Sequence, residues 1–302
     1  MSDYRSGFIA VMGRPNVGKS TLINRLLGQT IAAVSPKPQT TRLQQLGILT
    51  TESAQLVFID TPGLHNPQHR LGEYMNEAAR QALDDCDLGL LLVNASKIPP
   101  DPEDHLLGKI LRESGVQTPF MLVLNKIELV LPPDRAPARQ AYQPLLPEAD
   151  LISISARTGE GIDQLLSKLI QSLPEGPPLY PEDQITDLYE REIAADLIRA
   201  AAMLHLHYEL PHSIAVRMDE FKERGDQGAY IAATIFVERD SQKGIVIGEK
   251  GKMIKEISMS ARKEIEAMSG RKVYLDLRVK VRPNWRNDDN ALRLFGFKKS
   301  KS

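Results

Sequence analysis

The sequence has one cysteine, no long apolar run and no recognisable export signal. Cys86 has no second cysteine with which to form an internal disulfide, and no zinc-ligand spacing is present. The longest apolar runs, Leu88–Val93 and Pro119–Leu124, are far shorter than the ~20 residues that span a bilayer. The N-terminus leads straight into an apolar stretch, without a basic segment or a small-residue cleavage site. We therefore expect a reduced, soluble, cytoplasmic protein.

The length and composition predict about two folded domains. The chain has 302 residues, of which 42% are hydrophobic and 25% are charged. These values are close to the averages of soluble globular proteins, and each domain has enough apolar residues to bury a core. The composition therefore excludes a chain that is disordered throughout.

The charge is unevenly distributed. The formal net charge is 38 − 39 = −1, but residues 241–302 hold 16 basic and 7 acidic residues, a balance of +9. The remaining 240 residues balance at 22 − 32 = −10. A basic end on an acidic body favours a polyanionic partner for that end, although charge alone also fits a solvated basic tail.

The first part of the chain alternates short apolar runs with helical patterns. Such alternation predicts a mostly parallel sheet with helices on both faces and a ligand site at the carboxyl ends of the strands. The predicted strands are Phe8–Met12, Leu56–Ile59, Leu88–Val93, Phe120–Leu124 and Leu151–Ile154. The predicted helices are Lys19–Leu27, Leu71–Leu83, Glu103–Arg112 and Gly161–Leu173.

A proline-rich segment interrupts this alternation. Four prolines fall within residues 173–181, and they exclude a helix or a central strand. We predict domains at 1–173 and 182–302, joined by a semi-rigid linker at 174–181. The second domain is predicted to be α+β, with helices near 187–207, 252–268 and 289–294 and strands at 213–221, 229–238 and 273–281.

A glycine-rich segment joins the first predicted strand to the first predicted helix. Residues Gly13–Ser20 match Gly-x4-Gly-Lys-Ser, the phosphate-binding loop. In such a loop, backbone N–H groups surround the phosphates, Lys19 reaches the β- and γ-phosphates, and the Ser20 hydroxyl binds Mg²⁺. The strand before the motif and the helix after it make a chance match improbable.

Three further segments follow predicted strands and resemble GTPase motifs. Asp60–Gly63 resembles the magnesium-facing Asp-x-x-Gly, although alone it is also a good turn sequence. Asn125–Glu128 resembles the guanine-reading Asn-Lys-x-Asp. Ser155–Arg157 resembles the Ser-Ala-Lys segment, whose backbone N–H contacts the guanine oxygen. Their order along the chain supports an α/β P-loop GTPase domain.

Two positions depart from the usual GTPase pattern. Glu128 stands where Asp is usual, so its longer side chain needs a local shift to pair with guanine; otherwise it caps a surface helix. Leu64 stands where many GTPases have a water-orienting Gln, which predicts slow hydrolysis by in-line attack of water.

Residues Ser35–Arg42 lie between the first predicted helix and the predicted strand at Leu56. This loop resembles the switch that supplies a threonine to Mg²⁺. Thr40 and Thr41 are both candidates, and Thr41 is favoured. Such a loop orders with GTP and relaxes after hydrolysis. Asn16 has two interpretations: a ligand of K⁺, as in some relatives, or a side chain that stabilises the loop by a hydrogen bond.

The basic end contains a second glycine motif. Gly248–Gly251 lies between a strand-like run at 244–247 and an amphipathic helix, and this run closely resembles a KH domain in the prokaryotic, type II arrangement. The resemblance implies a clamp on a single-stranded nucleic-acid backbone. The RNA-binding residues implied are Ile247, Gly248, Glu249, Lys250, Gly251, Lys252, Lys255 and Arg262. Trp285 is predicted either to stack on a base or to lie in the core.

A GTPase domain followed by a KH domain resembles the Era family of bacterial GTPases. The resemblance implies a GTPase that binds 16S rRNA near its 3′ end, acts in 30S ribosomal subunit assembly, binds no DNA and associates loosely with the membrane. The implied GTP-binding residues are Gly13, Arg14, Pro15, Asn16, Val17, Gly18, Lys19, Ser20, Thr21, Asp60, Thr61, Pro62, Gly63, Asn125, Lys126, Glu128, Ser155, Ala156 and Arg157. Lys19, Thr41, Asp60 and Gly63 are the implied catalytic residues, and Ser20, Thr41 and Asp60 the implied Mg²⁺ ligands.

Two other function classes are considered. The first is a P-loop ATPase or kinase with an RNA clamp, against which Asn125 and Lys126 argue. The second is a passive RNA-binding assembly factor with a vestigial nucleotide site, which only Leu64 and Glu128 favour. For the GTPase, we expect GTP to order the switch loop and reposition the KH domain across the segment 174–181.

Overall fold

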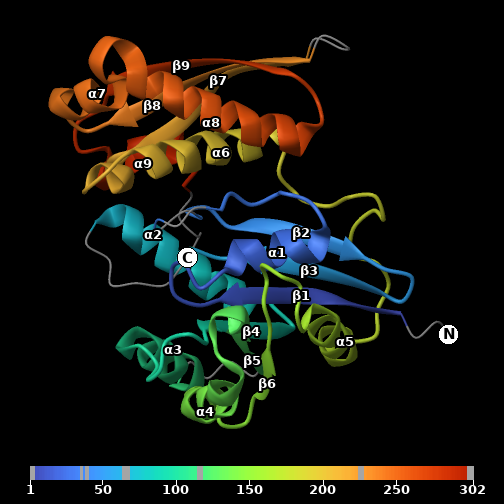
Figure 1. The fold of residues 1–302 in the computed structure, drawn as a ribbon. Helices are drawn as coiled ribbons and strands as arrows, with labels where there is room; N and C mark the ends of the chain where they lie inside the picture. Colours follow the sequence, from blue (N-terminus) through green and yellow to red (C-terminus); the bar gives the residue numbers. More distant parts are fainter. Residues whose placement is uncertain are drawn as a thin grey trace. The chain divides into compact units, whose positions relative to one another are not determined.

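The computed structural model describes residues 4–34, 37, 41–62, 69–113, 118–223 and 228–297 (Figure 1). The chain divides into two compact units. The first comprises residues 1–29, 41–66 and 75–187, and the second comprises residues 30–40, 67–74 and 188–302. Each unit has its own sheet and its own buried core.

The sheet of the first unit has six strands in the order β2-β3-β1-β4-β5-β6. All neighbouring strands are parallel except β2, which is antiparallel to β3. Strands buried on both faces read as continuous apolar runs, which is why five of them are visible in the sequence. The strands are β1 (Arg5–Met12), β2 (Gln45–Thr50), β3 (Ala54–Asp60), β4 (Leu88–Asn94), β5 (Phe120–Asn125) and β6 (Asp150–Ser153).

Helices cover both faces of this sheet. Ala10 and Met12 of β1 share a core with α2, α3 and α4, whereas Ile9 points to the opposite face, where α1 and α5 pack on β3 and β1. The predicted mostly parallel sheet with helices on both faces is confirmed. The helices are α1 (Lys19–Leu27), α2 (Arg70–Asp84), α3 (Pro102–Glu113), α4 (Arg135–Tyr142) and α5 (Ile162–Ser172).

The segment predicted as the linker lies against the first unit. The backbone N–H of Ser6 donates to the Pro174 carbonyl at 3.1 Å, and the Ser6 hydroxyl donates to the Pro177 carbonyl at 2.7 Å. The buried Gln55 amide donates to the Tyr180 carbonyl at 2.9 Å and accepts from the Leu179 N–H at 2.7 Å. Residues 174–187 therefore belong to the first unit, and the division between the units follows Asp187.

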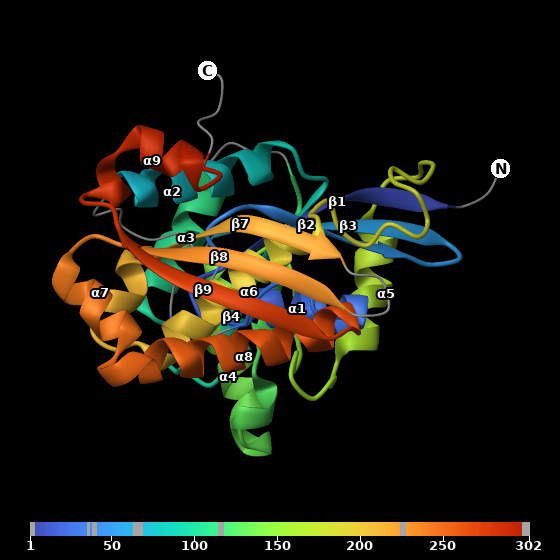
Figure 2. The same cartoon turned by 90° about the horizontal axis from the view of Figure 1, so that it is seen from above.

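The second unit has a three-stranded sheet in the order β7-β8-β9, whose strands lie side by side in Figure 2. Strands β7 and β8 are antiparallel, and β8 and β9 are parallel. The helix, two strands, two helices and strand follow in the order α6, β7, β8, α7, α8, β9. Their bounds are α6 (Glu190–His205), β7 (Ala215–Glu223), β8 (Ala229–Val237), α7 (Asp240–Ile247), α8 (Lys252–Ser269), β9 (Val273–Val281) and α9 (Asp289–Leu294).

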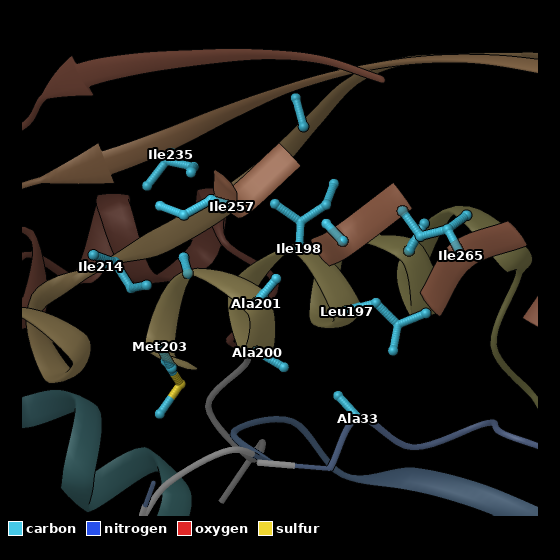
Figure 3. Packing of buried hydrophobic residues seen from close by; sticks show 14 of the residues in the cluster. Ala33, Leu197, Ile198, Ala200, Ala201, Met203, Ile214, Ile235, Ile257 and Ile265 are labelled. Atoms are coloured by element: carbon cyan, nitrogen blue, oxygen red, sulfur yellow. The ribbon is translucent and has the colours of Figure 1, made fainter. Parts of the chain in front are cut away.

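The core of the second unit lies between α6, α8 and one face of the sheet. Figure 3 shows Leu197 and Ile198 of α6 with Ile235 of β8 and Ile257 and Ile265 of α8. All five side chains are buried. Burying one such side chain contributes about 2 kcal/mol to folding, so this layer holds α8 in place in the second unit.

The prediction of a strand-like run at 244–247 is wrong. These residues form the end of α7, and Val246 is buried on its inner side. The Gln242 side chain accepts from the backbone N–H groups of Glu238 and Arg239, at 2.9 and 3.1 Å, and this caps the helix start. Capping and packing therefore outweigh the strand preference of isoleucine and valine.

Trp285 lies in the core of the second unit. Its side chain is fully buried, and the indole Nε1–H donates to the Ser213 carbonyl at 2.8 Å. Its ring meets that of Phe295 edge to face. The core interpretation of Trp285 is therefore confirmed, and the base-stacking interpretation is wrong.

Within the described residues, no helix is long and apolar enough to cross a membrane.

Candidate nucleotide and nucleic-acid sites

The phosphate-binding loop connects β1 to α1. Gly13 and Gly18 have φ angles of 141° and 108°, which favour glycine. A Cβ on Gly13 would lie 2.3 Å from the Leu92 carbonyl oxygen of β4, so the neighbouring strand also requires glycine there. The two glycines therefore let the backbone of the loop turn its N–H groups toward a phosphate. Gly18 directly precedes the first residue of α1.

Lys19 lies inside this loop. It is 7% exposed, and its Nζ donates to the carbonyls of Gly13 at 2.9 Å and Arg14 at 3.1 Å. Burial lowers the pKa of Lys19 to about 8, and the Asp60 carboxylate opposes that shift. The two carbonyls hold the ammonium inside the loop, in a position where it can bind a phosphate.

Ser20, Thr41 and Asp60 meet at the carboxyl end of β3. The hydroxyls of Ser20 and Thr41 donate to Asp60 Oδ2 at 2.9 and 3.1 Å, and the two hydroxyls lie 3.1 Å apart. Asp60 is fully buried, and within the described part of the chain its Oδ1 has no hydrogen-bond partner. Burial raises the pKa of this carboxyl, and Lys19 and the hydroxyls oppose the rise. Two hydroxyls and a carboxylate with an unused oxygen fit Mg²⁺, which prefers oxygen ligands.

Three residues of the predicted magnesium and γ-phosphate region lie outside the described residues: Thr40, Gly63 and Leu64. Among the described residues, the structure adds Gln45, which the sequence analysis missed. Gln45 is buried, and its Nε2 lies 3.5 Å from Asp60 Oδ2. No motif signals it, because its position depends on the pairing of β2 with β3.

Arg14 points away from the loop that carries it. Its guanidinium pairs with the fully buried Asp104 at 2.8 and 3.2 Å and with Asp101 at 3.0 Å. Both carboxylates lie at the start of α3 or just before it. Arg14 therefore fastens the phosphate-binding loop to α3, and only its backbone is left for the predicted nucleotide contact.

The predicted guanine segment follows β5. Asn125 is buried, and its Nδ2 donates to the Val17 carbonyl at 2.8 Å. Lys126 has a φ of 65°, and its Nζ donates to the Asn16 carbonyl at 2.7 Å. Both side chains thus tie this segment to the phosphate-binding loop. The Glu128 side chain is 14% exposed, and among the described residues its Oε2 is buried with no hydrogen-bond partner.

The segment Ser155–Arg157 lies beside these residues, after β6. The backbone N–H of Ala156 donates to Asn125 Oδ1 at 2.9 Å. Arg157 Nε lies 3.6 Å from Glu128 Oε1. The structure therefore brings together the two predicted guanine segments, although they are far apart in the sequence.

The predicted nucleic-acid loop lies between α7 and α8. Gly248, Lys250 and Gly251 have φ angles of 73°, 50° and 79°. A Cβ on Gly248 would lie 2.6 Å from the Cβ of Met253 and 2.8 Å from its backbone nitrogen, so this glycine is required. The loop leads into the N-terminus of α8, whose dipole favours a phosphate.

Basic side chains are exposed in this loop and along α8 of the second unit. The exposed ones are Lys250, Lys252, Lys255, Arg262 and Lys263. Glu249 is also exposed, and Ile247 is partly buried. Such an arrangement suits a nucleic-acid backbone, because cations and backbone N–H groups meet at one place.

Nucleotide affinity is expected to fall as the pH rises from 7 to 8.5. Without nucleotide, the Lys19 ammonium has a pKa of about 8. Bound phosphates raise this pKa because they stabilise the charged ammonium, so nucleotide binding above pH 8 takes up a proton. The affinity for GDP should then fall about fourfold from pH 7 to 8.5, and at higher pH the loss should approach tenfold per pH unit, or about 1.4 kcal/mol. Calorimetry in buffers of different ionisation enthalpy measures this uptake. Lys19→Arg, which stays charged, should flatten the profile, and equal slopes for both proteins would contradict the assignment.

Comparisons with known proteins agree with this geometry. The family model described as 50S ribosome-binding GTPase matches residues 8–126, and the KH domain model matches residues 209–286. The chain is similar to the crystal structure of Era with MgGDPNP and nucleotides 1506–1542 of 16S ribosomal RNA. It is also similar to a variant of Aquifex aeolicus Era bound to GDP and AlF4⁻. Each match has 39% identity and a TM-score of 0.91, and covers 97% of this chain and 99% of the other.

The predicted order of a P-loop GTPase domain and a KH domain is thus confirmed, as is the prediction of Mg²⁺ and a guanine nucleotide. The two folds lie in one chain, and the similarity extends over nearly its whole length. The chain belongs to the Era family of GTPases.

Proposed function

We propose that this protein binds and slowly hydrolyses GTP and holds the single-stranded 3′ end of 16S rRNA in its KH unit. In this role it is a nucleotide-controlled factor in the assembly of the 30S ribosomal subunit. One observation carries the proposal: a phosphate loop with an oxygen donor set and a basic glycine loop occur in one chain that is similar to Era bound to nucleotides 1506–1542 of 16S rRNA.

The hydrolytic step depends on how the residues of the first unit hold the phosphates. Lys19 neutralises charge on the β- and γ-phosphates. Ser20, Thr41 and Asp60 would hold Mg²⁺, which would supply further positive charge where negative charge develops on the phosphates in the transition state. The Gln45 amide, 3.5 Å from Asp60 Oδ2, helps to orient that carboxylate. Water attacks the γ-phosphorus in line, the bond from that phosphorus to the β–γ bridging oxygen breaks, and GDP and inorganic phosphate are the products.

The purine is read by the neighbouring segments. Asn125 links the base segment to the phosphate-binding loop. The Glu128 carboxylate, whose Oε2 has no hydrogen-bond partner among the described residues, accepts from the guanine ring N–H and exocyclic amine, and adenine offers no such pair of donors. Guanine selectivity is therefore expected to survive the replacement of Asp by Glu at this position.

A continuous path supports control of the RNA site by the nucleotide. Thr41 lies four residues before β2, and β2 is hydrogen-bonded to the end of the first unit. The Ile48 N–H donates to the Ile185 carbonyl at 2.7 Å, and the Leu46 N–H donates to Asp187 Oδ1 at 2.9 Å. Helix α6 of the KH unit begins soon after, at Glu190. A shift of Thr41 on GTP binding therefore has a short route through β2 to the KH unit.

GTP turnover and competition test this function directly. The purified chain with Mg²⁺ is expected to hydrolyse GTP slowly, and excess ATP should not displace labelled GTP. Equal competition by ATP would favour an ATPase or kinase instead. Absence of turnover both with and without a 16S rRNA 3′ fragment would leave a passive RNA-binding factor.

Two finer expectations belong to the same proposal. A K⁺ ion bound near Asn16 predicts faster GTP hydrolysis in KCl than in NaCl at equal ionic strength. Equal rates in the two salts would contradict K⁺ binding.

Peripheral membrane contact predicts co-sedimentation with anionic lipid vesicles, and a protein that stays in the supernatant would contradict it.

A further inference from the structure

Arg25, in the last turn of α1, reaches the loop that follows β6. Its Nε donates to the Ala156 carbonyl at 3.1 Å, and a terminal nitrogen donates to the Arg157 carbonyl. Basic residues in a last helical turn can bond the last carbonyls of their own helix. This guanidinium instead ties α1, which begins with Lys19 and Ser20, to the predicted guanine loop.

The same loop is held from its other side by Asn125. The Ala156 N–H donates to Asn125 Oδ1 at 2.9 Å, while the Ala156 carbonyl accepts from Arg25. The Ser155 hydroxyl accepts from the Thr158 N–H at 3.0 Å and closes the turn. Side chains from outside the loop therefore bond both the N–H and the carbonyl of Ala156, and they fix the direction in which its backbone points.

Glu128 reads a different edge of the purine. Its carboxylate pairs with the exocyclic amine and ring N–H of guanine, whereas the backbone of Ser155–Arg157 faces the 6-oxo group. Arg25 bonds only the loop backbone, and among the described residues no hydrogen bond or ion pair joins it to Glu128. The two edges can therefore be probed separately, because hypoxanthine keeps the 6-oxo group and lacks the amine.

We propose that Arg25 is a positioning residue for guanine binding, which holds the Ser155–Arg157 backbone in the direction that recognises the 6-oxo edge. The inference rests on the proposed assignment of the guanine site to Asn125, Glu128 and this loop. Arg25 acts through the loop rather than on the nucleotide. A guanidinium is suited to this task because its planar fork donates to two acceptors at once.

The test compares Arg25→Met and Arg25→Lys with the unaltered protein. Equilibrium binding of GDP and of inosine diphosphate is measured with Mg²⁺. Arg25→Met is expected to weaken both nucleotides by about tenfold, so that the ratio of their affinities stays unchanged. Arg25→Lys should recover part of the loss, because an ammonium still donates to one carbonyl. A loss for GDP alone would overturn the proposal, since it would assign Arg25 to the amine edge.

Arg112→Met is the matched control. Arg112 also bonds two successive carbonyls, of Pro144 at 3.3 Å and of Leu145, but these lie between α4 and β6. It is expected to bind GDP as the unaltered protein does, and an equal loss in this variant would overturn the proposal. So would an affinity of folded Arg25→Met within about twofold of the unaltered value.

Asn125→Ala separates this inference from the function on which it rests. If Asn125→Ala loses GDP binding while Arg25→Met keeps it, only the role of Arg25 is wrong. If Asn125→Ala also binds GDP undiminished, the guanine site itself is wrongly assigned. Circular dichroism of each variant confirms that the compared proteins are folded.

Discussion

Lys19→Met is expected to weaken GTP and GDP binding about a hundredfold. The variant removes a buried ammonium that is held inside the phosphate loop by the carbonyls of Gly13 and Arg14. Hydrogen bonds to charged groups contribute about 1.5–3 kcal/mol, and the upper value corresponds to a factor of about 100. Titration of a fluorescent guanine nucleotide with Mg²⁺ measures the loss.

Lys109→Met is the control for this experiment. Lys109 lies on α3, with a side chain that is 61% exposed and 3.9 Å from Glu113. An exposed pair of this kind contributes little to stability and none of its atoms belongs to the phosphate loop. Its nucleotide affinity should equal that of the unaltered protein. Undiminished binding by folded Lys19→Met would mean that the loop does not hold the phosphates.

Lys250→Asp is expected to lower the affinity for single-stranded RNA by at least about tenfold. The exposed Lys250 lies between the two glycines of the loop that precedes α8. The substitution removes one phosphate contact and adds a repelling charge at the same place, so the slope of log affinity against log salt should fall by about one. Fluorescence anisotropy at several salt concentrations measures both quantities.

Lys272→Asp makes the same charge change elsewhere in the unit. Lys272 follows α8 just before β9, and its side chain is 90% exposed. RNA binding should be nearly unaffected, because Lys272 lies at the opposite end of α8 from the glycine loop. Equal losses in Lys250→Asp and Lys272→Asp would mean that only the general positive charge attracts RNA, and that the glycine loop is not the binding site.

Local sequence patterns predict most of the architecture. The buried parallel strands appear as apolar runs, and the predicted bounds of β9 and α9 coincide with those in the structure. The glycine loops are also local, since the positive φ at Gly18 and Gly248 is a property of a few residues. Because strand ends in a parallel sheet meet at one edge, the order of the GTPase motifs was enough to predict that they meet.

Features that depend on distant partners were not predictable in the same way. Strand β2 is an edge strand with a glycine, and it is defined by pairing with β3 and with residues near Thr186. Helix α4 contains a proline and follows a turn, so its local pattern is weak. The partners of Arg14, Arg25 and Gln45 are set by the tertiary fold, and their residue types alone do not indicate them.

The proline-rich segment shows the same limit. Its composition indicates an end of regular structure but not what it packs against. Gln55, fully buried on β3, satisfies its amide with the backbone of Leu179 and Tyr180. Prolines lack the N–H that a sheet neighbour would use, but their carbonyls still accept, as those of Pro174 and Pro177 do from Ser6.

The affinity of the intact chain for a single-stranded RNA with the sequence of nucleotides 1506–1542 of 16S rRNA tests the central claim most directly. It is measured once with GDP and once with a non-hydrolysable GTP analogue, at one salt concentration and with Mg²⁺. Nucleotide control of the RNA site predicts that the two affinities differ by about 5- to 150-fold, and that the RNA changes the relative affinity for the two nucleotides by the same factor. Equal RNA affinities in the two nucleotide states would contradict it.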